Sequence, residues 1–278
     1  MPAISVRDAW IRSDRGRLFA RRWNPAPRND RAAVVLLHDS LGCVETWRDF
    51  PARLASASGR EVVAYDRLGF GRSDPHPDRL GFDFVHDEAR TGLRCLRDQL
   101  GLERFVAFGH SVGGGMAIAA AAQSGADCIA LITESAQAFV EDRTREGIRA
   151  ARQAFAGTDR LERLARYHGD KAAWVLGAWI DTWLAPEFAG WNLDADLRAV
   201  RCPALVLHGD RDEYGSARHP QRIAGGVAGP ADTHLLPDCG HVPHRERAEG
   251  VLDLVARWLD RLPPETDDAR NRLSDSTT

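Results

Sequence analysis

Residues 106–115 have the sequence VAFGHSVGGG, and a run of small residues, MAIAAAA, follows directly at 116–122. An apolar run, a Gly-His-Ser-Val-Gly turn and an alanine-rich run predict a buried strand, a tight turn carrying Ser111, and a helix. Gly109 and Gly113 lack Cβ atoms, so the strand and the helix can cross closely while Ser111 adopts a strained backbone conformation. This arrangement points the Ser111 hydroxyl out of the sheet, above the free N–H groups of the helix N-terminus, and predicts a nucleophile.

The composition of the 278-residue chain limits its class. Hydrophobic residues make up 44% and charged residues 28%, as in ordinary globular enzymes, and the formal net charge of −3 argues against a nucleic-acid or anionic-membrane partner. The N-terminus has no long apolar segment, so neither a signal peptide nor a membrane span is expected. An odd number of widely spaced cysteines predicts neither disulfides nor a zinc site, and it favours a cytoplasmic location. These five are Cys43, Cys95, Cys128, Cys202 and Cys239.

Short apolar runs alternate with helical patterns over most of the chain. Residues 4–23 alternate apolar and polar side chains around a turn at 13–16, which predicts an antiparallel hairpin at a sheet edge. Strands are then expected at 33–38, 61–66, 104–108, 128–133, 203–208 and 233–236, with helices at about 44–56, 84–100, 216–224 and from His244 to about 262. Strands separated by helices imply right-handed βαβ units and a doubly wound, mostly parallel α/β sheet.

The alternation stops between residues 135 and 197, where helical stretches carry many aromatic side chains. We expect a helical cap here, inserted into a core formed by residues 1–134 and 198–262, and a disordered polar tail at 263–278. The cap aromatics either pack the cap onto the core or line an apolar substrate pocket beneath it. The candidates for the pocket are Phe139, Trp174, Trp179 and Trp183.

A serine hydroxyl needs a neutral histidine to accept its proton, and that histidine must lie where the carboxyl ends of the strands converge. His241 follows the last predicted strand directly and is the expected base. His244 is a weaker candidate because it falls at the start of the last helix. The His241/His244 pair has no H-E-x-x-H pattern, so no metal is expected, and no cofactor motif is present.

An acid must orient the base, and two N–H groups must stabilise the oxyanion. Asp212 follows the strand before that of His241 and is the expected acid, with Glu134 and Asp210 as alternatives. The expected oxyanion donors are the backbone N–H groups of Val112 and Ser40. For the second donor, the neighbouring positions Asp39 and Leu41 remain open.

Several motifs together resemble the α/β-hydrolase superfamily. They are residues 109–113, the loop HDSLG at 38–42, DRLGFGRS at 66–73, GDRD at 209–212 and GHVPH at 240–244. The resemblance covers about residues 30–262. It implies an eight-stranded, mostly parallel sheet with helices on both faces and a helical cap after the sixth strand. It also implies Ser111 as nucleophile, Asp212 as acid, His241 as base, and the Ser40 and Val112 amides as the oxyanion hole.

The sequence departs from this family at one position. The family usually has glycine after the strand-end histidine, whereas this chain has Asp39. A carboxylate beside an oxyanion hole opposes the negative charge that forms there unless its side chain turns away. We therefore expect Asp39 to face an arginine or a backbone donor.

The nucleophile narrows the expected chemistry. Haloalkane dehalogenases and epoxide hydrolases of this superfamily carry an aspartate at the elbow, so Ser111 favours a serine hydrolase acting on a small-molecule ester or similar acyl compound through an acyl-enzyme. The alternative is a C–C bond hydrolase of aromatic ring-fission products. The segment WRDF at 47–50 resembles the Trp-x-Asn-type segment of such enzymes, with aspartate in place of asparagine. The arginines of the cap either clamp a substrate carboxylate or form a solvated helix face. Those arginines are Arg143, Arg145, Arg149 and Arg152. A non-catalytic ligand-binding receptor is the least favoured class, because all three expected catalytic residues are present.

Overall fold

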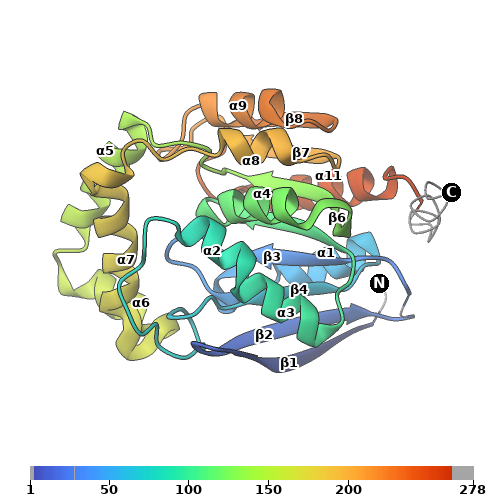
Figure 1. The fold of residues 1–278 in the computed structure, drawn as a ribbon, viewed down its shortest axis with the longest axis horizontal. Coiled ribbons are helices and arrows are strands. Elements are labelled where there is room, and N and C mark those ends of the chain that lie inside the picture. Colours follow the sequence, from blue (N-terminus) through green and yellow to red (C-terminus); the bar gives the residue numbers. More distant parts are fainter. Residues whose placement is uncertain (1–2, 28, 265–278) are drawn as a thin grey trace, which may run out of the picture.

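The computed structural model describes residues 3–27 and 29–264. Eight strands form one sheet in the order β1-β2-β4-β3-β5-β6-β7-β8 (Figure 1). The β1/β2 and β2/β4 pairs are antiparallel, and the remaining pairs are parallel. The strands are β1 Ile4–Ser13, β2 Gly16–Pro25, β3 Ala33–Leu37, β4 Val62–Tyr65, β5 Phe105–His110, β6 Cys128–Glu134, β7 Ala204–Gly209 and β8 Ala231–Leu236. The predicted edge hairpin and the mostly parallel sheet are confirmed.

Helices cover both faces of the sheet, because the central strands are buried on both sides. In β3, Val35 and Leu37 pack into one apolar cluster with residues of α2, α3, α4, α8 and α9. Val34 and Leu36 point the opposite way, into a second cluster with residues of α1 and α11. The helices of the core are α1 Phe50–Ser58, α2 Phe84–Arg90, α3 Gly92–Leu100, α4 Val112–Ser124, α8 Asp194–Ala199, α9 Arg218–Gly226, α10 Pro243–Glu246 and α11 Ala248–Asp260, with a short turn η2 Gly125–Asp127.

Three predicted helices are interrupted. The helix predicted at about 44–56 consists of a 3₁₀ turn, η1 Val44–Trp47, followed by α1. The two are separate because Arg48 has a positive φ of 55° and Pro51 favours a new helix start. The predicted helix at 84–100 breaks at Thr91 into α2 and α3. The final helix divides at Arg247 into α10 and α11. No helix in the described ranges is long and apolar enough to cross a membrane.

The segment between β6 and β7 forms a helical cap over one end of the sheet, on the left in Figure 1. Phe70 of the β4–α2 loop packs against Leu164 and Val175 of the cap. His168 adds polar contacts, since its Nδ1 accepts from the Gly71 N–H at 2.8 Å and its Nε2 lies 3.0 Å from the Leu41 carbonyl oxygen. The cap elements are α5 Asp142–Ala154, α6 Thr158–His168, η3 Gly169–Lys171, α7 Ala172–Leu184 and η4 Pro186–Phe188. Of the predicted disordered tail at 263–278, residues 265–278 lie outside the described residues.

Candidate active site

Ser111 occupies a sharp turn between β5 and α4. Its backbone has φ 57° and ψ −125°, a conformation that costs energy for a residue with a side chain. The turn is possible because a Cβ on Gly109 would lie 2.0 Å from the Gly113 carbonyl oxygen, and one on Gly113 would lie 2.1 Å from the Leu37 carbonyl oxygen. The side chain of Ser111 is therefore held at the carboxyl end of the sheet, beneath the cap.

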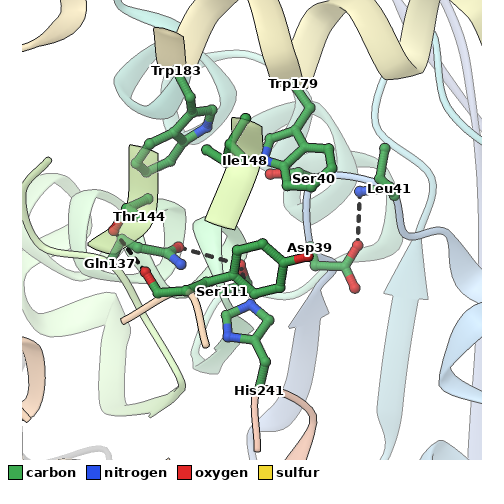
Figure 2. A pocket seen from close by; sticks show the side chains of 11 residues that line it. Asp39, Ser40, Leu41, Ser111, Gln137, Thr144, Ile148, Trp179, Trp183 and His241 are labelled. Carbon is green, nitrogen blue, oxygen red and sulfur yellow. Dashed lines mark hydrogen bonds between the residues drawn. The ribbon is translucent and has the colours of Figure 1, made fainter. Parts of the chain in front are cut away.

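The structure brings Ser111, His241 and Asp212 together, although they are far apart in the sequence. Figure 2 shows Ser111 and His241 side by side. His241 Nε2 lies 2.9 Å from Ser111 Oγ. His241 Nδ1 lies 2.9 Å from Asp212 Oδ1 and 2.8 Å from Asp212 Oδ2. The hydroxyl, the imidazole and the carboxylate form one continuous hydrogen-bonded line, in which the imidazole can accept the serine proton while the carboxylate holds its tautomer.

Asp212 is buried and fully engaged as an acceptor. Its Oδ1 accepts from the backbone N–H groups of Tyr214 at 2.8 Å and Gly215 at 3.0 Å. Burial raises the pKa of Asp212, but the charge and hydrogen bond of His241 and these backbone donors outweigh it and lower the pKa to about 2. Asp212 is thus a carboxylate at any pH at which the protein is expected to work, as an orienting acid requires.

The other carboxylates and the other histidine considered above have different partners. Glu134 Oε2 accepts from His244 Nδ1 at 2.6 Å, so these two side chains pair with each other and not with His241. Asp210 Oδ1 accepts from the Cys239 N–H at 3.2 Å, in the loop that leads to His241. The geometry therefore singles out His241 as the histidine in contact with the serine, and Asp212 as the carboxylate in contact with His241.

The β3–η1 loop carries one of the two expected oxyanion donors. The Leu41 N–H already donates to Asp39 Oδ1 at 2.8 Å, so Leu41 is unavailable for this role. The Ser40 N–H has no acceptor among the described residues, and the Val112 N–H belongs to the first turn of α4, where N–H groups lack helical partners. Val112 directly follows Ser111, and Ser40 lines the same cavity as Ser111, so both amides stay candidates for the oxyanion donors.

Asp39 turns partly away from the oxyanion region, toward two donors. Besides the Leu41 N–H, its Oδ2 lies 3.4 Å from His110 Nδ1. Burial opposes ionisation of Asp39, but the hydrogen bond and charge of His110 lower its pKa strongly. The expectation of a backbone donor matches this geometry. No arginine contacts the carboxylate, since Arg67 donates to the Asp39 carbonyl oxygen at 2.9 Å instead.

A cavity of about 150 Å³ opens beside Ser111 and His241, between the core and the cap. Trp179 and Trp183 of α7 line it from the side opposite His241, as predicted (Figure 2). Trp174 and Phe139 do not line it. Trp174 stacks on His76 with ring centroids 5.1 Å apart, and Phe139 stacks on His219 at 4.4 Å. The lining residues are Asp39, Ser40, Leu41, Ser111, Gln137, Thr144, Ile148, Trp179, Trp183, Tyr214 and His241.

Sequence reasoning missed Gln137, Thr144, Ile148 and Tyr214 as lining residues. Gln137 is the most consequential, because its Oε1 lies 3.2 Å from Ser111 Oγ. The Ser111 hydroxyl has one hydrogen, so it donates either to Gln137 or to His241, whose Nε2 is closer. Gln137 follows β6 in a loop without any recognisable motif, and only the helical spacing of Thr144 and Ile148 at i and i+4 carried a signal.

The cap arginines stay outside the cavity. None of Arg143, Arg145, Arg149 and Arg152 lines it, and Arg143 donates instead to the Asp212 carbonyl oxygen at 2.9 Å. Asp39 is the one residue of permanent charge in the lining. The described cavity therefore presents no cationic side chain to a substrate.

Comparisons with known proteins agree with this fold. Residues 34–254 match the model of the Alpha/beta hydrolase family, and the chain belongs to this family. It is 31% identical to the serine hydrolase BPHL of Homo sapiens over 236 residues, which cover 82% of this chain and 79% of that protein. It is 26% identical over 258 residues to a 2-hydroxy-6-oxononadienedioate/2-hydroxy-6-oxononatrienedioate hydrolase of Pseudomonas putida, covering 81% and 87% of the two chains.

The fold is also found in solved structures of low sequence identity. The enol-lactonase of Burkholderia xenovorans LB400 superposes with a TM-score of 0.68 at 20% identity, covering 91% of this chain and 100% of the other. At that identity the likeness shows the fold, which is the predicted α/β-hydrolase fold with an inserted cap.

Proposed function

We propose that this protein is a carboxylesterase-like serine hydrolase that cleaves esters of small, uncharged carboxylic acids through an acyl-enzyme on Ser111. The observation that carries the proposal is the line of hydrogen bonds from Asp212 through His241 to Ser111, with no spacing above 2.9 Å. The membership of the chain in the hydrolase family and its likeness to a serine hydrolase support this chemistry.

In the proposed mechanism, His241 accepts the Ser111 proton as Oγ attacks the ester carbonyl carbon. The resulting imidazolium is stabilised by the ionised Asp212 and donates its proton to the departing alcohol. A water molecule deprotonated by the same histidine then attacks the acyl-enzyme, releasing the acid and restoring the Ser111 hydroxyl. In both halves of the proposed reaction the oxyanion accepts hydrogen bonds from the Ser40 and Val112 N–H groups.

The cavity supports a small acyl group. A dry cavity of 150 Å³ in another protein holds benzene, and the cavity here has about the same volume. Its walls include the apolar side chains of Leu41, Ile148, Trp179 and Trp183. We therefore expect acyl chains of up to about six carbon atoms to be preferred, since longer chains must displace the cap.

C–C bond hydrolysis remains the second candidate, because the relative from Pseudomonas putida is named for cleavage of a dioate. A doubly carboxylated substrate needs cationic or multiple donor groups in its pocket. The described cavity has no arginine or lysine in its lining and one carboxylate, Asp39, which opposes a substrate anion. The charge of the cavity thus favours the neutral ester over the dienoate.

A rate series tests both candidates with the wild-type protein. The assay compares p-nitrophenyl acetate, butyrate, hexanoate and decanoate with one ring-fission dienoate. We expect the highest kcat/KM among the four- and six-carbon esters and slow turnover of the dienoate. A preference for the dienoate would instead assign the protein to C–C hydrolysis.

The nucleophile is tested by labelling with a fluorophosphonate and by Ser111→Ala. We expect the wild type to be labelled and the variant to be unlabelled, folded, and slower by at least about 10⁴-fold in kcat. Ser5→Ala, an exposed serine of β1, is the matched control and should behave as wild type. A wild-type protein that neither takes the label nor hydrolyses any substrate would indicate the receptor class.

A further inference from the structure

His110 is a buried histidine for which the proposed mechanism has no role. It stands directly before Ser111, at the end of β5, and its exposed fraction is 1%. Its Nε2 lies 2.7 Å from the backbone carbonyl oxygen of His241. Its Nδ1 lies 3.4 Å from Asp39 Oδ2. One imidazole therefore touches both the loop that carries the base and the loop that carries the Ser40 amide.

The two contacts together favour a hydrogen on each nitrogen of His110. The His241 carbonyl oxygen only accepts hydrogen bonds, so Nε2 donates to it. Nδ1 lies at ion-pair distance from Asp39 Oδ2, where a lone pair on nitrogen would face an ionised carboxylate, so a proton on Nδ1 is preferred. An imidazole with a hydrogen on both nitrogens is an imidazolium with a full positive charge. Burial opposes that charge, but the hydrogen bond to Asp39, the negative charge of Glu134 and the His241 carbonyl oxygen prevail and raise the pKa of His110.

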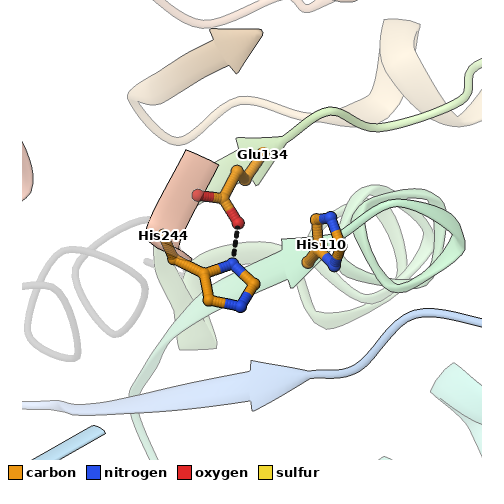
Figure 3. A group of neighbouring side chains, drawn as sticks. All are labelled: His110, Glu134 and His244. Carbon is orange, nitrogen blue, oxygen red and sulfur yellow. Dashed lines mark hydrogen bonds and ion pairs between the residues drawn. The ribbon is translucent and has the colours of Figure 1, made fainter. Parts of the chain in front are cut away.

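Behind His110 lies a second histidine–carboxylate pair, Glu134 and His244 (Figure 3). One ligating atom from each of His110, Glu134 and His244 lies within 4.8 Å of the others, a spacing that also occurs in metal sites. Here, however, both nitrogens of His110 already face oxygen acceptors, and His244 Nδ1 donates to Glu134. Glu134 Oε1 has no hydrogen-bond partner among the described residues, but each nitrogen of His110 already has an oxygen neighbour, which favours a proton on His110 over a metal ion.

The charges around His110 come from four directions. Asp39 and Glu134 are negative, and their pKa values are lowered despite burial. Burial lowers the pKa of His244, despite its contact with Glu134. The ring centroid of His241, which takes the Ser111 proton in the proposed reaction, is 5.1 Å away. Asp39 and Glu134 thus place two negative charges around the His110 ring.

We propose that His110 is a permanently charged positioning residue, which ties the Asp39–Ser40 loop to the His241 loop and neutralises the carboxylate beside the oxyanion site. This role rests on the proposed function, because it concerns the oxyanion of the Ser111 reaction. Without His110, Asp39 would become a half-buried carboxylate paired only with the Leu41 N–H among the described residues, beside the position where negative charge must form. The same change would remove the hydrogen bond to the His241 carbonyl oxygen, so the loop would hold the His241 side chain less firmly.

A double-mutant cycle separates this role from simple packing. In His110→Gln the side chain is neutral, and we expect kcat for p-nitrophenyl butyrate to fall 10- to 100-fold with KM nearly unchanged. Adding Asp39→Asn removes the unpaired charge, so the double variant should recover about tenfold of that loss, as expected for a coupled pair. If His110 only fills space, the two losses multiply and the double variant is the slowest, which would overturn the proposal.

His86 and Asp196 provide a matched control pair. His86 Nε2 lies 2.9 Å from Asp196 Oδ2, and this pair joins α2 to α8 away from the cavity. His86→Gln and Asp196→Asn, alone and together, should leave kcat within about twofold of wild type. A coupling in kcat as large as that of His110 and Asp39 would show that the cycle reports general stability, and would also overturn the proposal.

A spectroscopic readout is independent of turnover. In ¹H–¹⁵N spectra of the histidine side chains, the His110 signals, identified by their loss in His110→Gln, should show both nitrogens protonated at pH 7.5. In Asp39→Asn this protonation should be lost at lower pH than in the wild type. A neutral His110 at pH 7.5 overturns the proposal even if esters are hydrolysed. Absence of esterase activity with a doubly protonated His110 instead contradicts only the proposed function.

Discussion

The carboxyl edge of the sheet and the cap form the two sides of the same cavity by different means. At the sheet edge, Ser111 directly follows β5, and Asp212 and His241 lie in the loops after β7 and β8. Backbone N–H groups hold the Asp212 carboxylate in place. In the cap, Ile148 and Trp183 reach the cavity from helices and are held by side-chain packing. The sheet edge therefore supplies the reactive atoms at fixed positions, while the cap supplies apolar walls that can change without loss of the chemistry.

The largest test of this contrast lies at the sheet edge. Asp212→Asn keeps the shape of the side chain but offers an amide donor to His241 Nδ1, which favours the tautomer with a hydrogen on Nε2. That tautomer cannot accept the Ser111 proton, so we expect kcat for p-nitrophenyl butyrate to fall by about 10⁴-fold. Steady-state kinetics measure the loss, and circular dichroism verifies the fold.

Asp210→Asn is the control for that variant. Asp210 is an exposed carboxylate of the same loop and holds only the Cys239 N–H, at 3.2 Å. Its loss should lower kcat less than about tenfold. Equal losses in the two variants would mean that the loop conformation, and not the carboxylate of Asp212, controls the reaction.

A smaller effect is expected on the cap side. Ile148→Ala enlarges the apolar cavity, so the ratio of kcat/KM for decanoate to that for butyrate should rise about tenfold with little change in butyrate kcat. Leu164→Ala is the matched cap variant, since Leu164 packs against Phe70 outside the cavity. It should lose stability, roughly 2–4 kcal/mol in urea unfolding, without any change in chain-length preference. A shift of preference in both variants would contradict the assignment of the cavity as the acyl site.

The same contrast explains what could be predicted from the sequence. Strand ends carry strong local signals, so the fold and the neighbourhood of Ser111, Asp212 and His241 followed from apolar runs and short motifs. The cap sequence carries a weaker signal, which is the helical spacing of its tryptophans. Trp179 and Trp183 are four residues apart and share a helix face, whereas Trp174 is five residues from Trp179 and so lies about 140° around the helix. Helical spacing alone would have separated Trp174 from the cavity.

Two residues near Ser111 were beyond such reasoning. Gln137 reaches the serine because the loop after β6 is held by a hydrogen bond from the Ala138 N–H to His219 Nδ1, at 3.1 Å. His219 is 81 residues further along the chain, so no local pattern predicts the path of this loop. His110 was visible as the second residue of the Gly-His-Ser turn, but its contacts with Asp39 and His241 depend on three separate loops meeting.

The smallest expected effect is the change of folding stability with acid pH, to which many histidines contribute. Eight histidines of the described residues have shifted pKa values. The pKa is lowered in His38, His76, His168, His208, His219 and His244. It is raised in His86 and His110. A histidine with a lowered pKa takes up its proton more readily in the unfolded chain. Its contribution to stability is therefore complete above about pH 6.5 and is lost as the pH falls. For His219, this loss continues until the pH reaches its folded-state pKa of about 4.

The two raised histidines act in the opposite direction, and so do the carboxyls of Asp66 and Glu88, because burial raises their pKa values, to about 6 for Asp66. The six lowered histidines outnumber these four groups, so the expected net effect is a loss of stability on acidification. Between pH 6.5 and 5 the free energy of unfolding should fall by up to about 1.4 kcal/mol per pH unit for each histidine with a lowered pKa whose effect no opposing group cancels. Asp212, with a pKa of about 2, adds nothing to the slope in this range. Urea unfolding at pH 7.5, 6.5 and 5.5 measures this slope.

His168 connects the slope to the cap. Its Nδ1 accepts the Gly71 N–H, a bond that is lost when the imidazole is protonated. His168→Gln retains an acceptor that does not titrate, so the stability of this variant should fall less steeply with acid than that of the wild type. An unchanged slope would place the acid-sensitive contacts within the core of the sheet and leave the cap attached at low pH.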